Sequence, residues 1–221
     1  IEMMVGRKLE NEFPKEIRSP GEIRLRASKL NRGQKVKNIS LNVRSGEILA
    51  LTGLVGAGRT ETVRLLFGAD QPDSGDIELD GTKLILRKPS DAIEAGICLL
   101  TEDRKDQGLV LDQSIRDNFG LPNLKKFSNK GWINKLAEAD SFSDYIEKLQ
   151  IKVSGHLQLA SQLSGGNQQK VVLAKWLERN AEILIFDEPT RGIDVGAKYE
   201  IYQWMNQLAK AGKGIIMISS E

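Results

Sequence analysis

The chain has 221 residues, which is enough for one substantial core or for a core with a small attached lobe. Lysine and arginine number 32 and aspartate and glutamate 30, and this near balance argues against a dedicated nucleic-acid-binding protein. No run approaches the roughly 20 apolar residues of a membrane span, so any link to a membrane must come through partners. The single cysteine, Cys98, lies in an apolar run and is typical of a buried thiol in a reducing compartment.

Both ends of the chain have the character of cut ends. Residues 1–21 combine charge with prolines and Gly21, which is typical of a linker or an incoming arm. The last strand-like run, 215–219, stops at Glu221 with no helix after it. We therefore expect an excised domain over residues 22–221 that is truncated at its C-terminus, with a linker from a preceding domain in front of it.

Between these ends, strand patterns alternate with helix patterns. Apolar residues alternate with polar ones at 23–28 and 39–43, and the apolar run 48–51 predicts a parallel strand buried on both faces. Further strands are expected at 76–80, 83–87, 97–101, 183–186 and 215–219, and helices before Gly68 and at 90–95, 135–150, 166–177 and 196–210. The order predicts an α/β fold with a mostly parallel sheet. Residues 112–163, which lack strong strands, predict an inserted helical subdomain.

A glycine-rich segment follows the strand at 48–51 and opens a helix, which is the context of a P-loop. Glycines let consecutive backbone N–H groups turn toward phosphate oxygens, and Thr60 would offer its hydroxyl to Mg²⁺. The pattern has lysine where this chain has Arg59, whose planar guanidinium keeps the charge but not the geometry of lysine. A glycine-rich turn without a ligand is the alternative. The candidate nucleotide-binding residues are Gly53, Leu54, Val55, Gly56, Ala57, Gly58, Arg59 and Thr60.

Two acids follow the apolar run 183–186. Asp187 at a strand end can hold Mg²⁺ through water, and Glu188 beside it can polarise an attacking water, as a catalytic residue. Adjacent acids at a strand end are more often simply solvated. The distance in sequence from the glycine-rich segment and the following Pro189 and Thr190 favour the functional interpretation.

A second anion cradle is expected where a serine and two glycines begin the helix at 166–177. The alternative is an ordinary helix N-terminus that Ser164 caps. The run from Leu163 to Gln169 resembles the L-S-G-G-Q signature of ATP-binding-cassette (ABC) ATPases, with Asn167 inserted, and it lies between the helical insert and the acid-ended strand, as in that family. Its candidate binding residues are Ser164, Gly165, Gly166, Asn167 and Gln168.

This resemblance covers nearly the whole chain from about residue 22. The fold that it implies is a P-loop NTPase core with an N-terminal antiparallel β part. Four runs together resemble the second cassette of bacterial monosaccharide importers of the ribose, galactose and xylose type, and Met4 to Arg7 looks like the tail of a first cassette. The four runs are 102–105, 167–170, 190–198 and 219–221.

The chain departs from the family pattern at three positions, all in its own nucleotide site. Besides Arg59, Glu102 takes the place of the Q-loop glutamine and Glu221 that of the switch histidine. No aromatic residue stands between 22 and 46 to stack on adenine. Residues 192–194 resemble the D-loop, which in the family contacts the opposite cassette. These departures predict a site that binds nucleotide but hydrolyses it slowly or not at all.

What the resemblance implies for function follows from the pairing of ABC cassettes. ATP and Mg²⁺ are the implied cofactors, and each ATP lies between the P-loop of one cassette and the signature of the other. The implied partners are a homologous first cassette in the same polypeptide, transmembrane permease subunits and, indirectly, a sugar-binding protein outside the cell, but no nucleic acid. The expected location is the cytoplasmic face of the cell membrane, as a peripheral protein.

Two other classes of function stay open. A soluble ABC ATPase of translation or DNA repair usually carries basic arms or long coiled-coil inserts, and the sequence has neither. A non-hydrolysing nucleotide-binding or regulatory module is favoured by Arg59 and Glu221. An ATPase assay with and without the partner cassette separates that module from a working transport ATPase.

Overall fold

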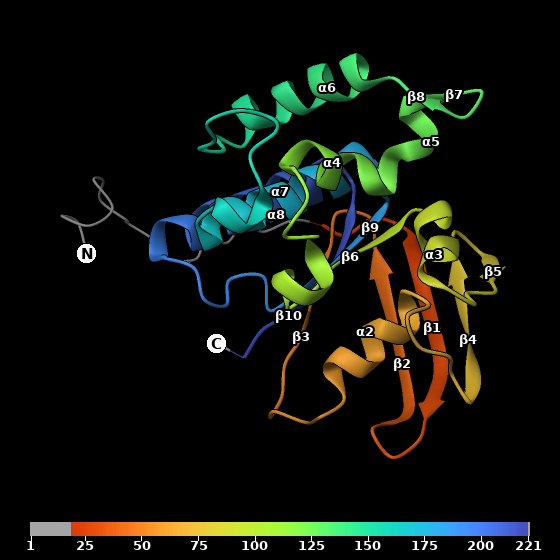
Figure 1. Cartoon of the computed structure of the whole chain (residues 1–221). Coiled ribbons are helices and arrows are strands. Elements are labelled where there is room, and N and C mark those ends of the chain that lie inside the picture. The colour runs from red at the N-terminus through yellow and green to blue at the C-terminus, as the bar shows by residue number, and fades with distance from the viewer. Residues whose placement is uncertain (1–18, 221) are drawn as a thin grey trace. The chain divides into compact units, whose positions relative to one another are not determined.

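The computed structural model describes residues 19–220 (Figure 1). Most of the expected linker 1–21, the tail-like Met4 to Arg7 and the expected switch position Glu221 lie outside the described residues. The chain forms two compact units, one from Ile1–Leu99 with Ala181–Glu221 and the other from Leu100–Asn180. Over residues 19–220, none of the helices is both long enough and apolar enough to cross a bilayer.

The first unit begins with an antiparallel sheet, as expected for the N-terminal part. It contains β1 (Ile23–Arg32), β2 (Val36–Arg44), β4 (Ser74–Leu79) and β5 (Thr82–Leu84) in the order β2-β1-β4-β5. Leu25 pairs with Val43 on one side and with Leu79 on the other, and all three side chains are buried. The expected strand at 83–87 is shorter in the structure, where β5 ends at Leu84.

The second sheet of this unit is parallel, as predicted. It contains β3 (Ile48–Leu51), β10 (Gly214–Ile218), β9 (Ile183–Asp187) and β6 (Ile97–Leu100) in the order β3-β10-β9-β6. Every residue of β9 is buried, which explains its continuous apolar sequence. The prediction that 48–51 is buried on both faces is wrong. Within the described part of the chain β3 pairs only with β10, at the edge of the sheet, and Ala50 is exposed.

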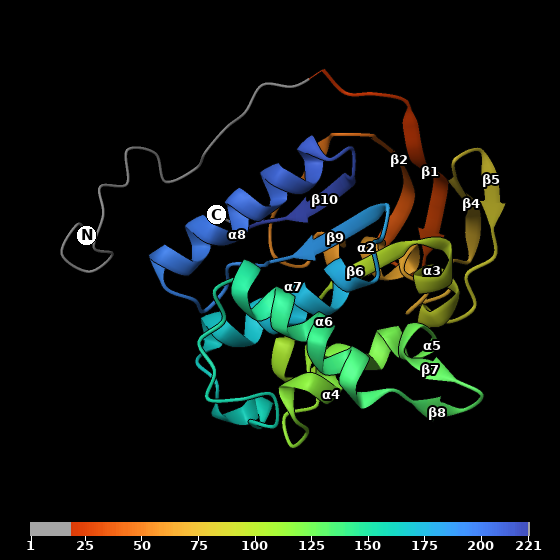
Figure 2. The same cartoon turned by 90° about the horizontal axis from the view of Figure 1, so that it is seen from above.

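Among residues 19–220, the helices of the first unit are α2 (Arg59–Leu66), α3 (Pro89–Ala95) and α8 (Val195–Lys210). Local sequence sets where they begin. Pro89 occupies the first turn of α3, and the side chain of Asp194 accepts a hydrogen bond from the backbone N–H of Ala197 to cap α8. Figure 2 shows α8 running alongside β10. Because β3 and β9 both pair in parallel with β10, the glycine-rich segment after β3 and the acids at the end of β9 lie at the same edge of the sheet.

The second unit is mainly helical and includes residues 112–163, for which the sequence predicted a helical subdomain. It is wider than that range because α7 packs against α4 and η2. A two-residue-per-strand hairpin, β7–β8, is an element that the sequence did not predict. The elements are η1 (Arg104–Gly108), α4 (Ile115–Gly120), η2 (Leu121–Asn123), α5 (Leu124–Phe127), β7 (Ser128–Asn129), β8 (Trp132–Ile133), α6 (Lys135–Lys148), η3 (Ala160–Gln162) and α7 (Gly165–Glu178).

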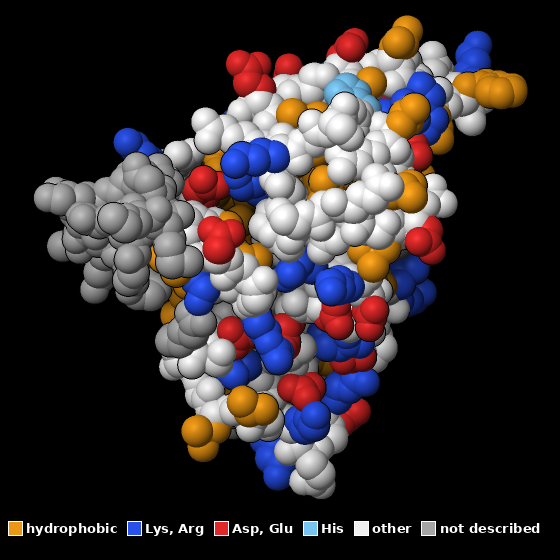
Figure 3. All heavy atoms as spheres, turned by 60° about the vertical axis from the view of Figure 1, so that its left-hand side comes forward, with side chains coloured by type: hydrophobic (Ala, Val, Ile, Leu, Met, Phe, Trp, Pro, Cys, Tyr) orange, Lys and Arg blue, Asp and Glu red, His pale blue; other side chains and the backbone are white. Residues whose placement is uncertain are grey.

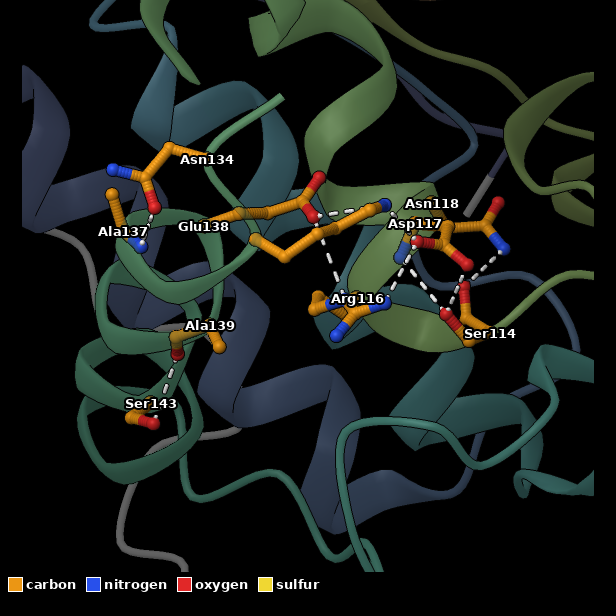
Figure 4. Close-up of polar contacts among 10 residues, drawn as sticks. Ser114, Arg116, Asp117, Asn118, Asn134, Ala137, Glu138, Ala139 and Ser143 are labelled. Carbon is orange, nitrogen blue, oxygen red and sulfur yellow. Dashed lines mark hydrogen bonds and ion pairs between the residues drawn. The ribbon is translucent and has the colours of Figure 1, made fainter. Parts of the chain in front are cut away.

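Aromatic rings and a charged network hold α4 to α6. The ring of Phe119 lies 4.8 Å from that of Phe142 and 5.5 Å from that of Tyr145, centroid to centroid. Beside these rings the carboxylate of Glu138, only 1% exposed, lies 3.5 Å from Arg116 Nε and 3.4 Å from Lys135 Nζ (Figure 4). A carboxylate this buried is stable only when cations accompany it, so the network fixes the side chain of Glu138 in place.

Lys135 also joins this network to the start of α4. Its Nζ lies 2.9 Å from Asp117 Oδ1, and Ser114 Oγ donates a hydrogen bond of 2.7 Å to Asp117 Oδ2 (Figure 4). Burial by itself raises the pKa of Asp117, but the hydrogen bonds from Lys135 and Ser114 outweigh it and lower the pKa to about 2. Asp117 therefore stays ionised at any physiological pH and keeps Lys135 in position.

The Gly120→Ala variant tests this arrangement. A Cβ at position 120 would lie 1.8 Å from Glu138 Oε1, and the cations around Glu138 leave its carboxylate little freedom to move. We expect a loss of about 1–3 kcal/mol in the free energy of unfolding, measured by urea denaturation. Gly155→Ala in the same unit is the matched control, because nothing lies within 4 Å of its added Cβ. Equal losses in the two variants would contradict the proposed clash.

Candidate nucleotide site

The glycine-rich segment forms the loop between β3 and α2. Gly56 and Gly58 have φ angles of 83° and 84°, in the left-handed region that favours glycine. A Cβ on Gly58 would lie 2.2 Å from the carbonyl oxygen of Lys35, so the loop approaches its neighbour too closely for any side chain there. Leu54 and Val55 are 85% and 92% exposed, so the outer part of the loop faces solvent. Such a loop presents backbone N–H groups at a helix start, where an anion binds well.

Arg59 is already engaged with groups at the ends of the neighbouring strands. Its Nη1 donates a hydrogen bond of 2.8 Å to the carbonyl oxygen of Ser219 and lies 3.8 Å from Glu188 Oε1. The Arg59 and Glu188 side chains are only 13% and 11% exposed, so water screens their attraction weakly. In this arrangement the cation of the P-loop compensates the charge of the candidate catalytic acid.

Glu188 itself has an unusual backbone. Its φ of 46° lies in the left-handed region, which costs a non-glycine residue roughly 1–3 kcal/mol and is common at functional sites. Its backbone N–H donates a hydrogen bond of 3.1 Å to the carbonyl oxygen of Ile218, at the end of β10. Ser220 Oγ donates a hydrogen bond of 3.1 Å to Glu188 Oε2. The surroundings thus hold the Glu188 carboxylate at the strand ends, near Arg59.

Thr60 and Asp187, the candidate metal ligands, also meet. Thr60 Oγ1 donates a hydrogen bond of 3.3 Å to Asp187 Oδ1, and Asp187 is 2% exposed. Burial raises the pKa of Asp187, and the hydrogen bond from Thr60 only partly offsets this. A hydroxyl and a carboxylate at this spacing match the oxygen ligands that Mg²⁺ prefers, so the donor set fits that cation.

The raised pKa of Asp187 leads to a prediction for Asp187→Asn. When the folded-state pKa exceeds the unfolded-state value, ionisation opposes folding at neutral pH and the effect disappears as the pH falls below the unfolded-state value. We expect Asp187→Asn to unfold at a higher temperature than the wild type at pH 7 without nucleotide, and the gap to narrow toward pH 4. Thermal unfolding at several pH values measures this, and a variant less stable at pH 7 would contradict it.

The predicted signature residues belong to the second unit, at the start of α7. Ser164 has the backbone conformation of an N-cap, but its side chain accepts no capping hydrogen bond. Its Oγ instead accepts a hydrogen bond of 3.1 Å from Asn167 Nδ2, and Asn167 Oδ1 accepts one of 3.0 Å from the backbone N–H of Lys152. Ser164 therefore does not serve as an ordinary side-chain cap of α7. Because Ser164 is exposed, the first backbone N–H groups of α7 are available to a ligand.

Gln168, also predicted to bind nucleotide, points into the protein instead. It is 4% exposed, and its Nε2 donates a hydrogen bond of 3.0 Å to the carbonyl oxygen of Ala160. Its Oε1 accepts a hydrogen bond of 3.4 Å from Arg104 Nε. Arg104 follows Glu102 in the run that resembles a Q-loop. Gln168 therefore ties the beginning of α7 to that run, within the second unit.

The structure thus brings four predicted residues together in the first unit and a separate group in the second. Arg59, Thr60, Asp187 and Glu188 converge, whereas residues 164–168 lie in the other unit. The Ser219 carbonyl and the Ser220 hydroxyl also contact this group, although the family pattern pointed only to Glu221 in that run. Asp194, in the run that resembles the D-loop, caps α8.

Curated relatives match the whole chain. The ribose import ATP-binding proteins of Bacillus licheniformis, Halalkalibacterium halodurans and Bacillus subtilis are 52%, 50% and 48% identical over 221 residues. The match covers 100% of this chain but only 44–45% of those proteins, so the chain spans less than half of their length.

Solved structures share the fold. A nucleotide-free ATP-binding cassette of an ABC transporter matches with a TM-score of 0.77 at 19% identity, over 90% of this chain and 82% of that one. A dimeric cassette in a post-hydrolysis state with ADP and phosphate matches with a TM-score of 0.75 at 21% identity, over 89% and 88%. The predicted P-loop NTPase fold is confirmed.

The family model described as "ABC transporter" matches residues 36–191, well over half of the chain. This range includes the P-loop, the signature and the two strand-end acids. The family that the motifs suggested is therefore confirmed by the family model and the relatives as well as by the fold: the chain is an ATP-binding cassette and belongs to the ABC transporter family.

Proposed function

We propose that the chain is one of two cassettes in the ATPase of a monosaccharide importer, and that it couples ATP binding and hydrolysis to sugar uptake. The observation that carries the proposal is the identity of about half of all residues with ribose import ATP-binding proteins over the full chain. The match covers less than half of those proteins, which leaves room for a homologous first cassette in the same polypeptide. Ribose is accordingly the first substrate to test.

The residues have distinct roles in binding Mg-ATP. The backbone N–H groups of residues 53–60 bind the phosphates, and Arg59 adds a positive charge. Thr60 and Asp187 hold Mg²⁺, which neutralises phosphate charge when it is bound. Glu188 orients the attacking water.

We further propose that this cassette's own site hydrolyses slowly and that its signature completes the site of the partner cassette. Arg59 lies 3.8 Å from Glu188 and compensates the charge that the carboxylate needs to accept a proton from water. The signature residues 164–168 at the start of α7 include no charged side chain that could be neutralised in this way, and Ser164 is exposed. The two nucleotide sites of the cassette pair are then unequal. Most hydrolysis takes place in the partner cassette's site, which Ser164, Gly165 and Gly166 complete.

The remaining partners follow from the proposed transport function. Closing and opening of the cassette pair drive transmembrane permease subunits, which take the sugar from a binding protein outside the cell. The chain then works at the cytoplasmic face of the membrane as a peripheral protein. A non-hydrolysing regulatory module is the second candidate, and the Arg59–Glu188 contact favours it for this chain on its own.

Calorimetric titration of Mg-ATP into the chain tests the proposal, with Arg59→Lys as the comparison. We expect binding in the micromolar to low millimolar range for the wild type, with hydrolysis near background. Arg59→Lys should bind Mg-ATP about tenfold more tightly, because lysine carries a compact point charge on a flexible stem, whereas Nη1 of Arg59 contacts both the Ser219 carbonyl oxygen and Glu188. Absence of binding by both proteins would overturn the nucleotide-binding role of this loop, and fast hydrolysis by the wild type would overturn the slow site.

A further inference from the structure

One end of the second unit exposes a cluster of large apolar side chains. It comprises η2, α5, the β7–β8 hairpin and the first residues of α6, and we call residues 121–136 the tip segment. In Figure 1 the hairpin projects from its unit. A soluble surface rarely exposes so many large apolar groups within a short stretch unless something binds there. The exposed fractions are 82% for Trp132, 77% for Leu136, 48% for Leu121, 40% for Leu124 and 40% for Ile133.

The tip segment is also basic. It has four exposed lysines, and no acidic residue occurs between Asn118 and Ala137. Lys126 contacts Glu178, and Lys135 contacts Asp117 and Glu138, but these lysines remain 58% and 50% exposed. In Figure 3 hydrophobic and basic side chains lie next to each other at the upper right, where this end of the unit projects. The four lysines are Lys125, Lys126, Lys130 and Lys135.

The hairpin presents Trp132 from a fixed frame. Asn129 pairs with Trp132 and Ser128 with Ile133, across a turn in which Lys130 and Gly131 have φ angles of 50° and 85°. Two consecutive residues of positive φ are typical of a tight type I′ turn. The frame is anchored through Phe127, which is buried and whose ring lies 6.0 Å from that of Phe119. A backbone held this way loses little conformational entropy when the side chains it carries bind a surface.

We propose that the tip segment contacts anionic lipid headgroups of the bilayer, with Trp132 and Leu136 in the interfacial layer and the lysines among the phosphates. Tryptophan concentrates at membrane interfaces because its ring is apolar and its N–H is polar, and lysines near an anionic leaflet add electrostatic attraction. A protein partner is less favoured, since the cores of protein interfaces are depleted of lysine. The inference deepens the proposed function, which is what brings the chain to a membrane.

Vesicle co-sedimentation of the 221-residue chain tests the contact. The probes are vesicles of phosphatidylcholine alone and of phosphatidylcholine mixed with phosphatidylglycerol. The test variant is Lys130→Gln with Trp132→Ser. The matched control is Lys83→Gln with Ile85→Ser, which removes the same charge and an apolar side chain at the same spacing in the first unit, where Lys83 is 64% and Ile85 71% exposed. None of these side chains is buried, so both variants should fold.

We expect the wild type and the control to bind the mixed vesicles and to bind neutral vesicles much more weakly. The test variant should bind the mixed vesicles at least tenfold more weakly, of which roughly fivefold comes from the lost lysine charge. Equal binding by the two variants, or equal binding of the wild type to both kinds of vesicle, would overturn the proposal. So would failure to bind vesicles together with Trp132-dependent retention by the permease in detergent. None of these results depends on ATP binding, so the Mg-ATP titration judges the proposed function separately.

Discussion

Replacing Ser164 with phenylalanine in the complete two-cassette transporter is expected to lower ATP hydrolysis by about 100-fold or more. Ser164 stands at the exposed start of α7, where the first backbone N–H groups of the helix point outward without partners in the helix. A phenyl ring there would fill the space in which the partner's triphosphate must approach Gly165 and Gly166. Losing preorganised donors to a developing negative charge typically costs two to three orders of magnitude in rate.

Steady-state hydrolysis and sugar uptake by transporter reconstituted in vesicles measure this effect. Ser161→Phe is the matched control, because Ser161 is exposed three residues before Ser164 and lies outside the start of α7. Arg59→Ala should cost much less than Ser164→Phe, since the proposal assigns little hydrolysis to the Arg59 site. The proposal of two unequal nucleotide sites would be contradicted if hydrolysis survived Ser164→Phe. It would also be contradicted if Arg59→Ala were as inactive as Ser164→Phe.

The second large effect is expected for Gly58→Ala, which should abolish Mg-ATP binding by the chain and destabilise the fold. Alanine at this position must adopt a φ of 84°, and its Cβ would lie 2.2 Å from the Lys35 carbonyl oxygen. That oxygen belongs to the backbone just before β2, so relief requires a shift of the loop and not of a flexible side chain. The strained backbone costs about 1–2 kcal/mol, and the forced movement adds about 1–3 kcal/mol.

The Gly81→Ala variant separates the cost of a strained backbone from the cost of the steric clash. It requires a similar φ of 76° in a turn between β4 and β5, but nothing lies within 4 Å of its added Cβ. We expect Gly81→Ala to lose only the backbone term in urea denaturation and to bind Mg-ATP as the wild type does. If Gly58→Ala bound Mg-ATP with unchanged affinity, the loop would not be the phosphate cradle, whatever its effect on stability.

The sequence by itself determined the elements and the family. Alternation at 23–28 and the apolar run at 183–186 predicted strands that the structure contains, because pleat periodicity and burial are local signals. The glycines of residues 53–60 predicted a turn between a strand and a helix, and the structure has a loop there with a left-handed backbone at Gly56 and Gly58. Motif order along the chain was enough to identify the ABC family, which the relatives confirm.

Tertiary structure decided what the local signals leave out. An apolar strand at the edge of a sheet can have the same sequence pattern as one at its centre. Only the strand order β3-β10-β9-β6 therefore showed that the run 48–51 is partly exposed. The hairpin of β7 and β8 is too short for a period to develop. Its exposed Trp132 could be recognised only once the surrounding surface was known.

The candidate site divides in the same way. The motifs along the chain proposed Thr60 and Asp187 as Mg²⁺ ligands and Glu188 as the catalytic residue. In the structure these residues meet because β3 and β9 both pair in parallel with β10, so the strands and the loops after them end at one edge of the sheet. That Arg59 contacts Glu188 and the Ser219 carbonyl, from segments 129 and 160 positions away, depends on how the strands pair. Gln168 reads as part of a signature motif yet is buried against Ala160. A motif specifies which residues occur together, whereas chain pairing and packing decide which side chain reaches which charge.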